Sequence, residues 1–197
     1  MPRRIDTQER ASVIAAAALR VLERDGLARL SVRSVAAEAQ LATASLRRAF
    51  PTQHALREYC LELIEERVTA RIAALELSGR ALVDAMLAQL LPLDGERRME
   101  LAAQVQLGML ALTDDTLRPA TAKLTEAVDR ACHTAIDILV AEDQFASDRS
   151  PDYETQRLHA LLDGVAMRWL WSGTPDDSSQ MLPVLKRHLD ELARSRL

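Results

Sequence analysis

The residues best suited to chemistry in this 197-residue sequence lie in the short segment between Leu41 and Phe50. The apolar residues Leu41, Leu46 and Phe50 are expected to face inward. The outward-facing residues between them are Thr43, Ala44, Ser45, Arg47 and Arg48. A short helix of this kind fits the major groove of duplex DNA, where base edges carry a distinct pattern of donors and acceptors. Thr43 and Ala44 open the helix and suit base contacts, whereas Arg47 and Arg48 at its far end suit phosphates.

The distribution of charge indicates that only the N-terminal part of the chain meets a polyanion. Residues 1–56 contain nine arginines and five acidic residues, a net charge of +4, although the whole chain carries −4. The alternative is a chance clustering of surface arginines. Arg3 and Arg4 have two interpretations, because they suit either an arm in the minor groove or a solvated tail.

Every sizeable segment repeats its apolar residues with helical spacing and none alternates with a period of two, which predicts an all-α fold. Aromatic residues make up only 3% of the chain, with 6 glycines and 7 prolines, a composition that favours packed helices. We expect about nine helices, at 6–24, 31–38, 42–48, 52–77, 80–91, 95–113, in a stretch after Thr116, at 153–172 and at 178–195. Gly26 suits a C-terminal cap and Ser31 an N-terminal cap.

The predicted helix over 52–77 has two apolar faces in succession. Leu56 and Cys60 share the first face, and Val68 and Ile72 share a second one that is rotated around the helix axis. One helix is therefore expected to serve two cores, a three-helix head and a helical-bundle body. We place a DNA-binding helix-turn-helix domain at 1–52 and a ligand-binding and dimerisation domain at 53–197.

Two parts of the chain resemble one family of DNA-binding proteins. The stretches "RASVIAAAALRVLERDGLARLSVRSVAAEAQ" and "LATASLRRAFPTQHAL" resemble the DNA-binding domain of TetR-type transcriptional regulators. The stretches "LPLDGERRMELAAQVQLGMLALTDDTLRP" and "LHALLDGVAMRWLWSG" resemble the ligand-binding half of the BetI-like branch. The resemblance implies a repressor that a small-molecule effector of unknown identity releases from a double-stranded DNA operator.

The resemblance also assigns residues and shows departures from the family pattern. Ser31 and Arg33 match positions that touch the DNA backbone or a groove edge, and Gln53 replaces the usual lysine at the start of the long helix. Arg47 stands where the family has tyrosine. Gln40 replaces a glycine that adopts a left-handed conformation, which should cost about 1 kcal/mol. These departures put the operator sequence in doubt, but the charge available for phosphates is nearly unchanged.

The last two helices are predicted to form the interface of a homodimer. Their candidate interface residues are Leu158, Ala160, Leu162, Gly164, Trp171, Leu185, Leu189 and Leu192. A twofold dimer would place two recognition helices about 34 Å apart, one turn of DNA, or somewhat more. The alternative is that both faces of the 153–172 helix belong to the core of a single chain.

Polar or soft residues on otherwise apolar helices are the candidates for an effector pocket. They are Met86, Gln104, Met109, Cys132, His133, Asp163, Met167 and Trp169. Trp169 and Trp171 with the carboxylate of Asp163 suit a quaternary ammonium ligand held by cation–π contact. The alternative for each residue is an ordinary place in the core.

Other classes of function lack their motifs in this sequence. The four histidines are scattered, no nucleophile elbow or glycine-rich phosphate loop is present, and Cys60 and Cys132 lie outside any CxxC pattern. We therefore expect no enzyme, no metal and no cofactor. No apolar run is long enough for a bilayer, so we expect a cytoplasmic protein without a membrane partner. The rival hypothesis is a helical scaffold derived from such a regulator that no longer binds DNA.

Overall fold

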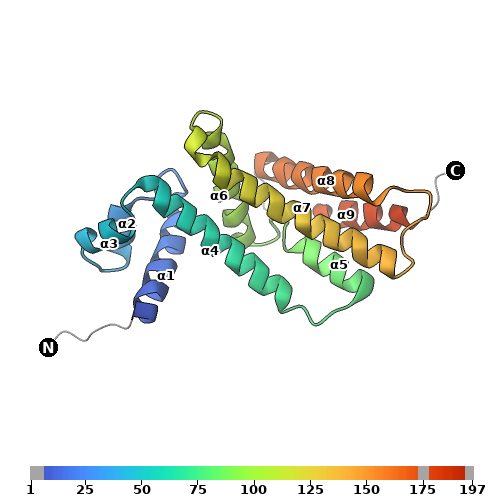
Figure 1. Cartoon of the computed structure of the whole chain (residues 1–197), viewed down its shortest axis with the longest axis horizontal. Helices are drawn as coiled ribbons and strands as arrows, with labels where there is room; N and C mark the ends of the chain where they lie inside the picture. The colour runs from blue at the N-terminus through green and yellow to red at the C-terminus, as the bar shows by residue number, and fades with distance from the viewer. Residues whose placement is uncertain (1–6, 173–177, 194–197) are drawn as a thin grey trace. The chain divides into compact units, whose positions relative to one another are not determined.

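The computed structural model describes residues 7–172 and 178–193, and these ranges are helical with short connections (Figure 1). The elements are α1 (Thr7–Asp25), α2 (Val32–Glu38), α3 (Thr43–Ala49), α4 (Gln53–Ala73), α5 (Gly79–Ala88), α6 (Gly95–Ala111), a 3-10 turn η1 (Asp115–Leu117), α7 (Arg118–Ala141), α8 (Pro151–Ser172) and α9 (Ser178–Leu192). The nine α-helices in the described ranges confirm the all-α prediction. None of these helices is long and apolar enough to cross a membrane.

The helix boundaries differ from the predicted ones by a few residues where local caps decide them. The long helix α4 ends at Ala73 and not at 77, because Leu75 turns back on Ile72 through a 3.1 Å backbone hydrogen bond. Further along the chain, α8 begins at Pro151 and not at 153, since proline fits the first turn of a helix. Residue 6 and residues 194–195, expected at helix ends, lie outside the described residues, as do Arg3 and Arg4.

The chain divides into two compact units, each of which has a buried core. Unit 1 comprises residues 1–66 and 102–121, and unit 2 comprises residues 67–101 and 122–197. This division shows that the second half of α6 packs with the N-terminal helices. The functional boundary between residues 52 and 53 is a different division, and it stays a prediction.

The core of unit 1 is made of small and medium-sized side chains. On α1 the side chains of Ile14, Ala17, Ala18, Val21 and Leu22 are all buried. Leu27 and Leu30 of the α1–α2 loop and Leu46 of α3 are completely buried as well. α1 packs on α2, and α2 packs on α3, so the three short elements form one block.

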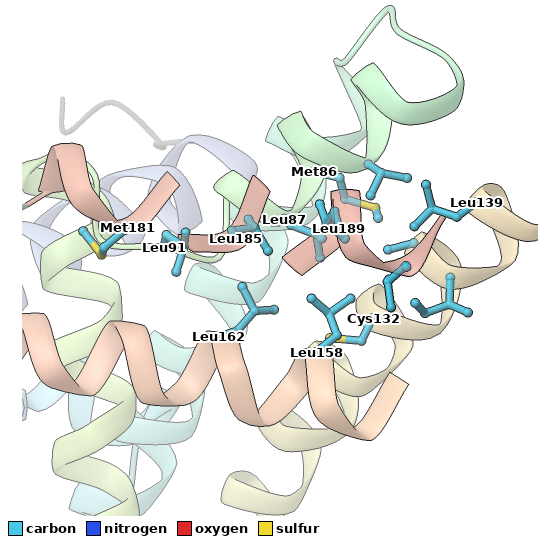
Figure 2. Packing of buried hydrophobic residues seen from close by; sticks show 14 of the residues in the cluster. Met86, Leu87, Leu91, Cys132, Leu139, Leu158, Leu162, Met181, Leu185 and Leu189 are labelled. Atoms are coloured by element: carbon cyan, nitrogen blue, oxygen red, sulfur yellow. The ribbon is translucent and has the colours of Figure 1, made fainter. Parts of the chain in front are cut away.

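The core of unit 2 is a cluster contributed mainly by α5, α7, α8 and α9 (Figure 2). Its fully buried members include Leu87, Leu139, Leu158 and Leu189. Ile72 and Leu75, near the C-terminal end of α4, pack against this cluster, whereas Leu56 and Cys60 belong to unit 1. The prediction that one long helix serves two cores is thus confirmed.

Unit 2 also contains buried ion pairs. The Glu154 carboxylate at the start of α8 is completely buried and bonds Arg149 at 3.0 Å and Arg157 at 2.8 Å. Arg71 of α4 bonds Glu100 of α6 at 2.6 Å, and the Glu100 side chain is almost fully buried. These pairs fix the ends of helices that the apolar cluster joins along their length.

Candidate nucleic-acid interface and helix-groove cavity

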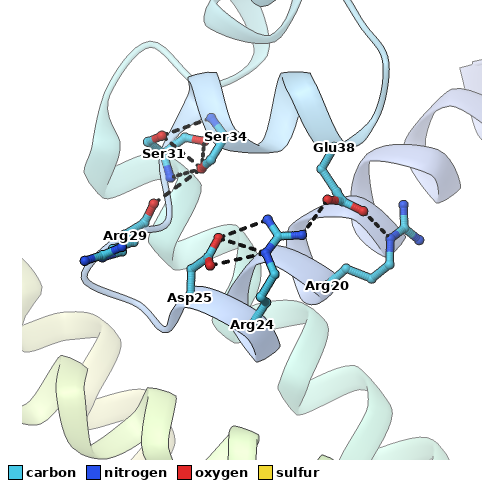
Figure 3. A network of polar contacts seen from close by, with 7 residues as sticks. All are labelled: Arg20, Arg24, Asp25, Arg29, Ser31, Ser34 and Glu38. Atoms are coloured by element: carbon cyan, nitrogen blue, oxygen red, sulfur yellow. Dashed lines mark hydrogen bonds and ion pairs between the residues drawn. The ribbon is translucent and has the colours of Figure 1, made fainter.

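The start of α2 is fixed by reciprocal hydrogen bonds between two serines. The Ser31 hydroxyl accepts from the backbone N–H of Ser34 at 3.0 Å, and the Ser34 hydroxyl accepts from the backbone N–H of Ser31 at 3.0 Å (Figure 3). This pattern is a capping box, which satisfies N–H groups that have no partner inside the helix. The predicted cap at Ser31 is confirmed, and it aligns the first turn of α2.

The turn between α2 and α3 is a regular helix end built with an unusual residue. Gln40 has a φ of 55°, the left-handed conformation that favours glycine. The Leu41 N–H donates to the Ala36 carbonyl at 2.9 Å, and the Gln40 N–H donates to the Ala37 carbonyl at 3.2 Å. These two bonds make a Schellman motif, so the turn keeps its geometry despite the glutamine.

α3 buries one side and exposes the other. Leu46 is completely buried, while Ala44, Arg47 and Arg48 are exposed. Thr43 and Ser45 are half-buried. The exposed face therefore offers short side chains near the start of α3 and two guanidinium groups near its end, the arrangement that base and phosphate contacts require.

Three polar contacts around α3 connect residues that are distant in the sequence. Arg10 of α1 donates to the Ser45 hydroxyl, which engages one of the predicted DNA-contacting groups. Gln53 donates its amide to the Leu30 carbonyl and so connects the start of α4 to the α1–α2 loop. Gln106 of α6 accepts from the Leu27 N–H at 2.8 Å. Arg10 and Gln106 could not be predicted as contacts from the sequence, because each lies far along the chain from the residue it bonds.

The arginines of this region differ in whether a carboxylate pairs with them, and those on α1 belong to an ion-pair network with Glu38 of α2. Glu38 bonds Arg20 at 2.7 Å and Arg24 at 2.9 Å, and Arg24 also bonds Asp25 (Figure 3). Hydrogen bonds from Arg20 and then Arg24 lower the pKa of the Glu38 carboxyl. Arg33, Arg47 and Arg48 have no acidic partner among the described residues and are exposed. The positive charge available for phosphates therefore lies at the start of α2 and the end of α3.

Unit 2 has a cavity of about 340 Å³ in the groove between α8 and α9. The groove is lined by small and apolar residues, which are Ala160, Leu161, Gly164, Val165, Met181 and Val184. Its polar groups come from Arg168, Trp169, Ser172 and Gln180. The guanidinium of Arg98 lies 5.0 Å from the centre of the Trp169 ring, so one face of the indole already carries a cation.

Two family models match the chain, and together they cover most of it. Residues 14–60 match bacterial regulatory proteins of the tetR family, and residues 79–194 match the C-terminal part of BetI-type transcriptional repressors. The chain belongs to the TetR family of transcriptional regulators. As a TetR-family regulator it is a DNA-binding protein, and the first match contains α2, the turn and α3 described above. Nothing supports the alternative of a scaffold without DNA binding.

Relatives of this TetR-family regulator cover almost its whole length. The HTH-type transcriptional regulator PksA of Bacillus subtilis (strain 168) is 27% identical over 195 residues, 98% of this chain and 94% of PksA. A TetR transcription regulator from Haloarcula marismortui ATCC 43049 has the same fold, with a TM-score of 0.81 at 20% identity over 94% of this chain and 98% of that one. A transcriptional regulator from Saccharomonospora viridis, solved in complex with choline, gives 0.75 at 20% identity over 93% and 96% of the two chains.

The predicted effector residues of this TetR-family regulator lie in different surroundings. Met86 and Cys132 are buried in the core of unit 2, while Met109, His133 and Asp163 are exposed. Gln104 and Met167 are half-buried, and neither lines the α8–α9 cavity. Of the eight predicted residues only Trp169 lines it. The α8–α9 cavity does not test the other seven residues, which stay predicted effector residues.

Of the three groups predicted to hold a quaternary ammonium ligand, only Trp169 lines the α8–α9 cavity. Trp171 is 71% exposed and does not line the cavity, and Asp163 faces His159, with 3.8 Å between its carboxylate and the imidazole.

Burial raises the pKa of the Cys60 and Cys132 thiols to about 12, so both are neutral at physiological pH. TetR-family proteins are regulators and generally not enzymes, and buried neutral thiols fit that description.

The predicted dimer residues fall into two groups. Leu158, Leu162, Leu185 and Leu189 lie in the core of a single chain of this TetR-family regulator (Figure 2). Leu192 is completely buried in the same core, so the prediction was wrong for all five. Their strict spacing marks the face that α8 and α9 turn toward α5 and α7. Ala160, Gly164 and Trp171 lie on the exposed side of α8. These three remain predicted interface residues.

Proposed function

We propose that this TetR-family regulator is a dimeric repressor of the bacterial cytoplasm whose α3 helices bind a DNA operator, and that a small molecule releases it. Thr43, Ala44 and Ser45 contact bases, and Arg33, Arg47 and Arg48 contact phosphates. Ser31 and Gln53 act through the caps and contacts that hold α2 and α4. The exposed pair Arg47–Arg48 at the end of a helix anchored by Leu46 carries this proposal.

The DNA part of the proposal is tested by fluorescence anisotropy with two duplexes of equal length. One duplex contains the region upstream of the protein's own gene, and the other has a scrambled sequence. We expect tighter binding to the upstream duplex, and weaker binding to both when Arg47 or Arg48 is changed to alanine. Arg130→Ala is the matched control, because Arg130 is an exposed arginine on α7, outside both α3 and the proposed dimer face. Equal binding of both duplexes by the wild type would contradict operator recognition.

The dimer is proposed to form through the exposed side of α8 and α9. Small residues at 160 and 164 let a partner helix approach closely, and Trp171, Leu182 and Val184 are large exposed apolar side chains nearby in the sequence. The α8–α9 cavity opens among these residues and is proposed to be covered by the second copy. Within one chain a Cβ added at Gly164 meets no atom within 4 Å, so Gly164→Arg should fold normally. Light scattering should show a dimer for the wild type and a monomer for Gly164→Arg.

The effector is proposed to act through a difference in affinity between two states of the dimer. A ligand that lowers operator affinity by some factor must itself bind the operator complex more weakly by the same factor. Choline is the first compound to titrate, since a protein of the same fold was solved with it. Choline chloride at a fixed total ionic strength should lower operator affinity if choline belongs to the effector class, and sodium chloride is the control.

A further inference from the structure

We propose that Gln106 of α6 is a positioning residue of the DNA-binding surface, which holds the α1–α2 loop and with it the orientation of α2. The inference rests on the proposed operator binding and deepens it. Gln106 lies outside the family match at residues 14–60 and outside the predicted DNA-binding domain. It therefore adds a residue of the C-terminal half to the machinery that presents α3.

The contact between Gln106 and the loop is close. The Gln106 side-chain oxygen accepts from the Leu27 N–H at 2.8 Å, and the Leu27 side chain is completely buried. Gly26 has a φ of +72°, and a Cβ built there would lie 3.4 Å from both polar atoms of the Gln106 amide. Glycine suits position 26 because the left-handed conformation there ends α1, and the Gln106 amide packs within van der Waals reach of it.

Two further contacts hold the same loop, and both come from residues inside the family match at 14–60. The Ser34 hydroxyl donates to the Arg29 carbonyl at 3.3 Å (Figure 3). The Gln53 amide donates to the Leu30 carbonyl. Ser31 follows at once and caps α2. The loop from residue 26 to 30 is therefore held at three successive points, and only the contact at Leu27 comes from beyond residue 60.

Loss of the Gln106 bond should affect specific binding more than general affinity for DNA. Base contacts require α3 to lie in one position, whereas attraction between arginines and phosphates tolerates displacement. Two equivalent bonds in a dimer, each of ordinary strength, correspond to roughly a tenfold change in specific affinity.

The test compares two substitutions at position 106 in the full-length protein. Gln106→Met keeps the length of the side chain and removes the acceptor, whereas Gln106→Glu keeps an oxygen that accepts from Leu27. Both are titrated with the upstream and the scrambled duplex at one salt concentration. Hydrogen exchange of the Leu27 amide reports the bond directly, and far-UV circular dichroism reports whether each variant is folded.

We expect Gln106→Met to bind the upstream duplex about tenfold more weakly and the scrambled duplex unchanged, with faster exchange at Leu27. Gln106→Glu should keep the wild-type ratio between the two duplexes. Wild-type binding by Gln106→Met, an equal loss for both duplexes, or a ratio for Gln106→Glu as low as for methionine would each overturn the inference alone. Failure of the wild type to distinguish the duplexes would overturn the proposed function together with it.

Discussion

The two units of the molecule place their carboxylates in opposite environments. In unit 1, Glu38 bridges Arg20 and Arg24, whose side chains are 53% and 58% exposed (Figure 3). In unit 2, Glu154 is completely buried between Arg149 and Arg157, and Arg149 is only 9% exposed. An exposed ion pair contributes little to the free energy of unfolding, because water solvates both charges when the pair is broken. A buried charge has no such solvation, so removal of its partner is strongly destabilising.

This difference follows from what each unit is proposed to do. A surface that binds DNA must keep its arginines in water, where they can release counterions and reach phosphates. A unit that carries the dimer face must keep its helices in register, and buried ion pairs at helix ends can do so together with the apolar core. The same ion-pair chemistry is therefore expected to be dispensable for the stability of unit 1 and essential for that of unit 2.

The largest effect is expected from Glu154→Gln. This change leaves Arg149 largely buried without its anion and should destabilise unit 2 by about 3–5 kcal/mol. Both tryptophans of the chain, Trp169 and Trp171, lie in unit 2, so their fluorescence during urea unfolding reports this unit. An unfolding midpoint equal to that of the wild type would show that the buried pair is not essential.

A pH effect should also be confined to unit 2, at His188 of α9. Burial, followed by the positive charge of Arg157, lowers the pKa of His188, although Glu154 and Glu191 oppose the shift and Arg149 adds to it. The unfolded chain therefore takes up a proton near pH 6.5 that the folded chain does not, and stability should fall as the pH drops below that value. Tryptophan-detected urea midpoints at pH 7.5, 6.5 and 5.5 should fall less for His188→Gln. A fall equal to that of the wild type would mean that other groups cause the pH effect.

A smaller effect, and one of opposite sign, is expected in the turn of unit 1. Gln40 has a positive φ, so Gln40→Gly should stabilise unit 1 by about 1 kcal/mol without a change in the turn. Far-UV circular dichroism during urea unfolding measures the gain, and tryptophan fluorescence should show no change in unit 2. A lower stability of the glycine variant would mean that the glutamine side chain makes a contact of its own.

The smallest effect is expected from Glu38→Gln, the counterpart of the change at Glu154. Its partners Arg20 and Arg24 are more than half exposed, so water replaces the lost ion pairs and the midpoint of urea unfolding should stay within error of the wild type. A loss comparable to that of Glu154→Gln would remove the contrast between the two units.

Local features of the DNA-binding region could be predicted from the sequence, because neighbours in the chain create them. The cap at Ser31 and the buried Leu46 follow from spacings of a few residues, and the left-handed residue 40 follows from the resemblance to the TetR pattern. Gln106 and Arg10 could not be predicted, since their partners lie 79 and 35 residues away.

The stripe of leucines on α9 was misassigned for a related reason. Regular spacing identifies an apolar face, but it does not distinguish the core of one chain from an interface between two. Leu185 and Leu189 face the unit 2 core, and the exposed side of α8 is marked by small residues such as Gly164. A cavity between two helices depends on their packing and has no signature within either helix alone.

α3 is proposed to bind DNA phosphates through Arg47 and Arg48, and the salt dependence of binding tests this proposal most directly. The logarithm of the binding constant for the upstream duplex falls linearly with the logarithm of salt concentration, by about 0.9 for each phosphate neutralised. With two arginines removed from each protomer of a dimer, the slope for the Arg47→Ala, Arg48→Ala double variant should be shallower by about three to four. An unchanged slope in a folded, dimeric double variant would contradict the account.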